Sequence, residues 1–217
     1  MGTSSTTSAS TRLPNPTPEQ RRQATLQFER GSALVASGAY QHGIRLLREC
    51  CRLEPANLLY RQALRRAEKA RFGNRPPTCW FAWLFNWRLR CRFRAACRVG
   101  NPLQVLELGE ALLVDDPWES AVQVQMAVAA ESLGLIDLAI WLLEQARHRQ
   151  PNHPEWNRQL AHLYERRGHF TQALALWQLV LEAVPQDEEA RRKVPALAPL
   201  SSDPQQRTQE RRSAQAS

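Results

Sequence analysis

Residues 134–151 read GLIDLAIWLLEQARHRQP, and residues 168–185 read GHFTQALALWQLVLEAVP. Each stretch opens on a glycine and closes on a proline seventeen residues later, and the second stretch begins 34 residues after the first. The same spacing recurs at Gly38–Pro55 and Gly100–Pro117. A period of this size is typical of one supersecondary unit stacked on copies of itself. The spacing therefore predicts a repeat architecture.

The pattern inside each stretch is that of a helix. Apolar residues fall three and four positions apart, which places them on one helix face. Small Ala139 and Ala173 occupy equivalent positions, as do Leu143 and Trp177. A second helical pattern precedes each glycine. The glycine can end this preceding helix because it can adopt the left-handed conformation. The closing proline ends the helix that follows the glycine, because proline cannot continue a helix. Each unit is thus predicted to be helix, tight turn, helix.

The units resemble the tetratricopeptide repeat family. Residues 154–185 match the family pattern best, residues 120–151 next, and residues 24–55 and 86–117 at fewer positions. The matching residues of the two fuller units are Met126, Ala127, Ala130, Gly134, Ala139, Ala146, Pro151, Leu160, Ala161, Tyr164, Gly168, Phe170, Ala173, Trp177 and Pro185. The resemblance, to stand-alone bacterial members, covers most of residues 20–195. It implies an all-α fold, a right-handed α-solenoid of antiparallel helix pairs with about four repeats plus capping helices.

The period is broken once, and the break divides the chain. From Gly38 to Gly100 is 62 residues, so one repeat has been replaced by something shorter. A helix is expected over residues 58–71, capped by Asn57 and with an apolar stripe that begins at Leu59. The predicted parts are a disordered tail (1–17), a first repeat with a solvating helix (18–71), an aromatic and basic insert (72–87), three contiguous repeats with a C-terminal capping helix (88–197) and a disordered tail (198–217).

The net charge of +8 conceals two blocks of opposite sign. Residues 61–98 hold eleven basic side chains and one acid, whereas residues 101–146 hold eight acids and no lysine or arginine. On the helix expected after the insert, Arg90, Arg94 and Arg98 share one face at a spacing of four. Like charges at this spacing repel one another. The row is therefore expected to meet negative charge, either the acidic block of the same chain or an external acidic ligand.

The resemblance implies that this row looks into a concave groove. By the same correspondence, the groove continues with Val124 and Val128, and then with Arg158 and His162. The valines would form an apolar floor, and the arginines would engage carboxylates of a short acidic segment of a protein partner. One subclass of the family clamps a C-terminal carboxylate with an asparagine. Because Arg94, Val128 and His162 stand at the equivalent positions, that type of binding is not expected.

The tryptophans of the insert admit two interpretations. Trp80, Trp83 and Trp87 would share one helix face, and they could fill the gap left by the shortened repeat. Alternatively, they form an exposed aromatic patch that binds a partner helix, an anionic membrane or nucleic acid. Binding of nucleic acid or an anionic membrane through residues 61–98 is the alternative function. Self-association, with the basic block of one copy against the acidic block of another, is a third hypothesis.

The sequence carries no sign of catalysis. It lacks a phosphate-binding loop, a Gly-x-Ser-x-Gly motif and a His-Glu-x-x-His motif. Its five cysteines have no metal-ligand spacing, and the repeat geometry would scatter its clustered histidines, so no metal or cofactor is expected. An odd number of cysteines, with no transmembrane run or signal peptide, favours a reduced, cytoplasmic setting. The prediction is a non-enzymatic cytoplasmic scaffold.

Overall fold

The structure is a computed structural model that describes residues 13, 15–76 and 86–201. Within these ranges all regular elements are helices, and none is a strand. The chain forms two compact units, Met1–Leu138 (unit 1) and Ala139–Ser217 (unit 2), and the boundary falls inside helix α8 (Ile136–Arg147). The predicted all-α fold class is confirmed. The predicted tails and most of the insert, including Trp80 and Trp83, lie outside the described residues.

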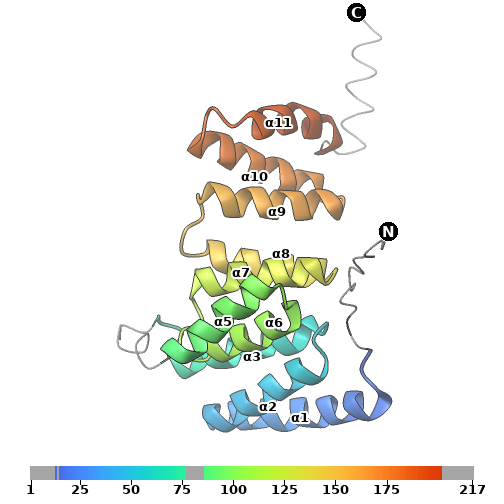
Figure 1. The fold of residues 1–217 in the computed structure, drawn as a ribbon, viewed down its shortest axis with the longest axis vertical. Coiled ribbons are helices and arrows are strands. Elements are labelled where there is room, and N and C mark those ends of the chain that lie inside the picture. Colours follow the sequence, from blue (N-terminus) through green and yellow to red (C-terminus); the bar gives the residue numbers. More distant parts are fainter. Residues whose placement is uncertain (1–12, 14, 77–85, 202–217) are drawn as a thin grey trace, which may run out of the picture. The chain divides into compact units, whose positions relative to one another are not determined.

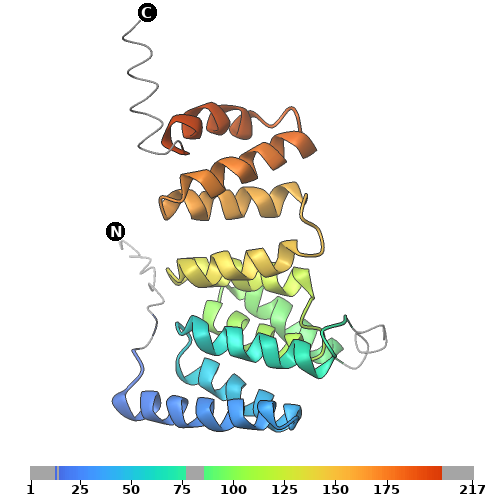
Figure 2. The same cartoon turned by 180° about the vertical axis from the view of Figure 1, so that it is seen from behind.

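Unit 1 consists of successive helices (Figures 1 and 2). Its helices are α1 (Pro18–Ala36), α2 (Tyr40–Leu53), α3 (Leu58–Arg71), α5 (Trp87–Val99), α6 (Pro102–Leu113) and α7 (Ser120–Ser132). Along the chain α1 packs on α2, α2 on α3, α5 on α6, and α6 on α7. The predicted helix over 58–71 is confirmed as α3, and the Asn57 side chain accepts a hydrogen bond from the Leu59 backbone N–H at 3.1 Å. Asn57 thereby satisfies one of the free donors at the start of that helix.

The first core of unit 1 joins α1, α2 and α3. Its buried members are Ala24, Ile44, Leu47, Cys50, Cys51, Tyr60, Leu64 and Ala67. Cys50 is fully buried and its thiol donates to the Ala24 carbonyl oxygen at 3.3 Å, as suits a small core residue. The predicted stripe of α3 was wrong at its first position. Leu59 is 66% exposed, because the buried face of this helix instead runs through Tyr60, Leu64 and Ala67.

The backbones of α1 and α2 approach closely at two glycines. A Cβ atom added to Gly43 would lie 2.8 Å from the Gly31 carbonyl oxygen and 2.6 Å from Cγ2 of Val35. The first neighbour is backbone, which cannot move aside as a side chain can. The helix pair therefore depends on the missing side chain at this position.

Replacing Gly43 with alanine is expected to lower the free energy of unfolding by about 1–3 kcal/mol, because the added methyl group overpacks this contact. Urea denaturation followed by circular dichroism measures the change. Gln41→Ala, at an exposed position of the same helix, serves as the matched control and should stay within about 0.5 kcal/mol. Equal stability of the Gly43 variant and the wild type would contradict the close approach.

Unit 2 repeats the same arrangement. It contains the end of α8, then α9 (Pro154–Arg166), α10 (Phe170–Ala183) and α11 (Glu188–Ser201). Helix α10 packs against both α9 and α11. The fully buried apolar residues of α9, α10 and α11 are Leu160, Ala161, Ala173, Trp177, Val180 and Ala190. Helix α11 extends to Ser201, beyond the point where the C-terminal tail was predicted to begin. Leu197 is buried and the Ser201 carbonyl accepts a hydrogen bond from Thr171, so tertiary contacts hold this end in place.

The glycines and prolines that define the period have distinct structural roles. Gly38, Gly100, Gly134 and Gly168 all adopt a positive φ, between 71° and 84°, which confirms their predicted left-handed conformation. Each closing proline offers its carbonyl oxygen to a side chain six residues later. The four donor–acceptor pairs are Arg61 to Pro55, Gln123 to Pro117, Asn157 to Pro151, and Arg191 to Pro185. This repeated hydrogen bond ties each closing turn to the helix that follows it.

Candidate functional site

The row of arginines on α5 borders a pocket in unit 1. The pocket has a volume of about 340 Å³ and lies between α5 and α7, with Leu112 of α6 also in its wall; we call it the α5–α7 pocket. Its lining residues are Arg90, Phe93, Arg94, Cys97, Arg98, Leu112, Glu119, Ala121, Val122 and Gln125. Phe93 and Ala96 are the buried residues of α5, and Phe93 forms part of the pocket wall beside the arginines. The structure thus brings the three predicted arginines to one site.

Arg90 is neutralised within the chain. Its guanidinium forms a two-pronged ion pair with Glu119, with a distance of 2.8 Å between Nη2 and Oε2. Both side chains are about one-fifth exposed (19% and 20%), so water screens the pair only in part. Glu119 belongs to the acidic block, so the hypothesis of neutralisation by that block holds for this arginine. Arg90 therefore helps to shape the pocket wall rather than offering a free positive charge.

Arg94 and Arg98 differ from Arg90. Both side chains are exposed, and within residues 13, 15–76 and 86–201 neither forms an ion pair. They lie one and two turns along the helix from Arg90, at the same pocket. The pocket therefore combines two unpaired guanidinium groups with an apolar wall that includes Leu112 and Val122.

The predicted apolar floor is only half accessible. Val124 is 8% exposed and belongs to the buried side of α7, so it offers little surface to a ligand. Val128, one turn later, is 48% exposed. Neither valine lines the α5–α7 pocket.

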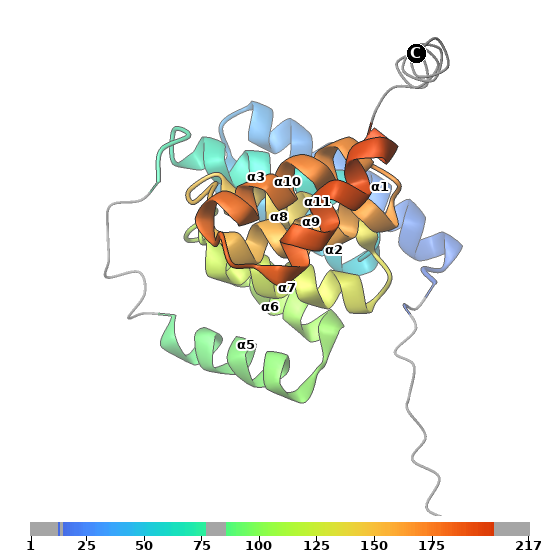
Figure 3. The same ribbon diagram turned by 90° about the horizontal axis from the view of Figure 1, so that it is seen from above.

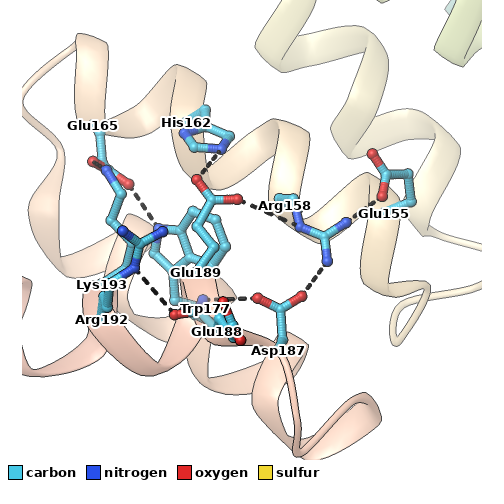
Figure 4. Close-up of polar contacts among 11 residues, drawn as sticks. Glu155, Arg158, His162, Glu165, Trp177, Asp187, Glu188, Glu189, Arg192 and Lys193 are labelled. Atoms are coloured by element: carbon cyan, nitrogen blue, oxygen red, sulfur yellow. Dashed lines mark hydrogen bonds and ion pairs between the residues drawn. The ribbon is translucent and has the colours of Figure 1, made fainter.

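The two remaining groove residues lie in unit 2, where a set of acids meets them (Figure 4). Arg158 forms ion pairs with Glu155 and Asp187, and its Nε lies 3.8 Å from a carboxylate oxygen of Glu189. The hydrogen bond to Asp187 raises the pKa of Arg158. The pKa of Asp187 is lowered, first because its carboxylate accepts the Ala190 backbone N–H at the start of α11, and also because of Arg158. The positive charge of Arg158 is thus already matched within the unit.

His162 and Trp177 occupy the other side of this cluster. The His162 ring meets the Trp177 ring edge-on at 5.0 Å, and its Nε2 lies 3.2 Å from Oε1 of Glu189. The Trp177 indole N–H donates to Glu165 at 2.7 Å, and Lys193 binds the second oxygen of the same carboxylate at 2.6 Å. The sequence did not point to this network because its members come from three different helices. Its contacts link α9, α10 and α11 to one another.

The sequence also missed a buried ionic cluster in unit 1. Glu110 of α6 forms ion pairs with two arginines: its Oε1 lies 2.6 Å from Nη1 of Arg61, and its Oε2 lies 2.9 Å from Nη2 of Arg65. Arg65 also pairs with Glu68. All four side chains are at most 4% exposed. Burial raises the pKa of Glu68, and Arg65 opposes the shift. The available signal was the helical spacing of residues 61, 65 and 68, on the same face as apolar Leu64.

The exposed tryptophan that the structure describes is Trp87. Its side chain is 57% exposed, and the Arg88 guanidinium lies 5.9 Å from its ring centre. For this ring, the hypothesis that it fills the gap of the shortened repeat is wrong, since it faces solvent at the start of α5. Trp80 and Trp83 lie outside the described residues.

Residues 13, 15–76 and 86–201 show neither a metal-type cluster nor a helix suited to a membrane span. Among them, no group of three or more His, Cys, Asp or Glu side chains is placed to hold a metal ion. None of the described helices has the length and apolar character that crossing a membrane requires.

Comparison with known proteins supports the repeat architecture. Residues 133–194 match the family model of the tetratricopeptide repeat. The tetratricopeptide repeat domain of P58(IPK) is similar in structure, with a TM-score of 0.50 and 14% identity over 81% of this chain and 45% of that one. MamA gives a TM-score of 0.45 with 13% identity, covering 83% of each chain. TTC0263, a thermophilic tetratricopeptide repeat protein of Thermus thermophilus, gives a TM-score of 0.36 with 20% identity, covering 81% of this chain and 98% of that one. No curated protein matches the chain.

Proposed function

Because the chain is a tetratricopeptide repeat protein, a class that serves as protein–protein interaction scaffolds, we propose that it holds a short acidic segment of a partner protein at the α5–α7 pocket. The observation that carries the proposal is the pair of exposed, unpaired guanidinium groups of Arg94 and Arg98 beside an apolar wall. A guanidinium group binds a carboxylate through two parallel hydrogen bonds. Two guanidinium groups that lie one helical turn apart can bind a segment with two neighbouring acidic side chains.

The pair between Arg90 and Glu119 supports this preference. An unpaired glutamate at the pocket would repel an incoming carboxylate, and Arg90 removes that repulsion. The exposed Ala121 and the half-buried Cys97 in the wall favour an apolar side chain between the acids of the ligand. Gln125 is exposed at the same wall and can hydrogen-bond the ligand backbone.

The proposal centres on unit 1 rather than on the whole predicted groove. In unit 2, Arg158 is engaged by Glu155, Asp187 and Glu189, so an acidic ligand would have to displace carboxylates already in place. His162 contacts Glu189 in the same cluster. The free positive charge of the predicted site is therefore at Arg94 and Arg98.

Reversing both charges, Arg94→Glu with Arg98→Glu, is expected to weaken binding of an acidic peptide by at least about tenfold. The probe is a fluorescent peptide with leucine flanked by aspartates and glutamates, and fluorescence anisotropy gives its affinity. Arg21→Glu with Arg22→Glu changes the net charge equally at exposed positions of α1, and it should cost less than about threefold. Equal losses in the two variants would attribute binding to net charge and overturn the proposal, as would unchanged affinity in the first.

A further inference from the structure

The outward face of α5 mixes exposed apolar and basic side chains. Its exposed residues on the side away from the α5–α7 pocket are Trp87, Arg88, Cys91, Arg92, Ala95 and Val99. At 100° per residue they occupy one continuous face of the helix. We call this set the outer face of α5. None of its members lines the α5–α7 pocket.

Nothing within the described ranges covers this face. Helix α5 packs on α6, its buried residues Phe93 and Ala96 lie outside this face, and Figure 3 shows α5 beside α6. Trp87 is 57% exposed and Val99 is 81% exposed, which makes Val99 the most exposed large apolar side chain in the described structure. Two large apolar groups stand in water without a partner from α6.

The charge on this helix is positive throughout. Helix α5 contains no acidic residue, and of its five arginines Arg90 alone forms an ion pair within the described chain. Arg88 and Arg92 on the outer face are exposed and unpaired there, and Arg94 and Arg98 stand at its margin. A second copy of the same face would bring like charges together, which disfavours pairing of two such helices.

We propose that the outer face of α5 docks on an anionic lipid surface. A helix with arginines beside tryptophan and aliphatic side chains suits the boundary between headgroups and acyl chains, where arginine pairs with phosphate and the apolar groups are buried. Tryptophan in particular is enriched at that boundary. The exposed Val99 and Ala95 decide against nucleic acid, because phosphate contacts alone leave apolar side chains in water. The site is peripheral, and it is independent of the peptide pocket.

The test uses the full chain and flotation with phosphatidylcholine vesicles, with and without phosphatidylserine, at about 50 mM salt. Binding to the anionic vesicles alone is expected. Arg88→Gln with Arg92→Gln should weaken it about 30-fold, and Trp87→Ala about tenfold. The control, Arg21→Gln with Arg22→Gln, removes the same charge from α1 and should weaken vesicle binding by less than about threefold.

Three results would overturn the proposal. The first is no binding to anionic vesicles, and the second is an equal loss in both paired arginine variants, which would show attraction by net charge alone. The third is tight binding to single-stranded RNA that Arg88→Gln with Arg92→Gln weakens by the same factor as it weakens vesicle binding. The face would then be a nucleic-acid site. The peptide test at Arg94 and Arg98 reads out separately, so either proposal can fail without the other.

Discussion

Replacing Glu110 with glutamine is expected to lower the free energy of unfolding by about 3–5 kcal/mol. The substitution keeps the size of the side chain but removes the negative charge that Arg61 and Arg65 share. Both guanidinium groups are 2% exposed, so water cannot replace the lost partner. Glu68 still pairs with Arg65, whereas Arg61 keeps only the carbonyl oxygen of Pro55. Urea denaturation followed by far-UV circular dichroism measures the loss.

Glu107 provides the matched control for this variant. It lies one turn earlier on α6 and is exposed, so Glu107→Gln should change stability by less than about 0.5 kcal/mol. A loss below about 1 kcal/mol in Glu110→Gln would mean that the two arginines find other partners or reach water. The buried cluster would then not be a structural requirement of unit 1.

Replacing Trp177 with alanine is expected to lower the free energy of unfolding by about 3–5 kcal/mol. The side chain is fully buried, so its removal leaves a cavity between α9, α10 and α11. It also removes the indole donor to Glu165 and the ring against which His162 packs. Thermal and urea unfolding both report the change.

Two further variants separate the causes of that loss. Trp177→Phe retains most of the apolar volume but lacks the donor to Glu165, so it should cost less than Trp177→Ala. Trp87→Ala removes the same side chain at a position that is 57% exposed and should change stability by less than about 0.5 kcal/mol. Similar losses at positions 87 and 177 would contradict the burial of Trp177 in the core of unit 2.

The local features of the fold could be predicted from sequence because they depend on neighbouring residues. A glycine at positive φ ends a helix wherever it stands, and apolar residues three and four apart share a face in any helix. The extent of α3 followed from Asn57 and the pattern after it. The shared face of Arg90, Arg94 and Arg98 followed in the same way from their spacing.

The partners of these side chains could not be predicted, because they come from distant parts of the chain. Arg90 and Glu119 are 29 residues apart, and Arg61 and Glu110 are 49 apart. The two charge blocks showed that opposite charges were available, but several acids could have met each arginine. The hydrogen bond from the sixth residue after each closing proline had a signal in the sequence, a polar residue at each of the four positions. The structure shows the role of this polar residue, because its side chain donates to the proline carbonyl oxygen.

The sequence by itself determined the repeating helix pairs, because a period of 34 residues with glycine and proline at set positions admits few other structures. Tertiary structure alone decided which charges are matched and which are free. Ion pairing depends on distances of a few ångströms between side chains from different helices, and periodicity does not specify them. Arg61, Arg65 and Arg90 are thus paired, whereas Arg94 and Arg98, identical in the sequence pattern, are exposed and unpaired within the described residues. That difference is why the proposed peptide site lies at Arg94 and Arg98.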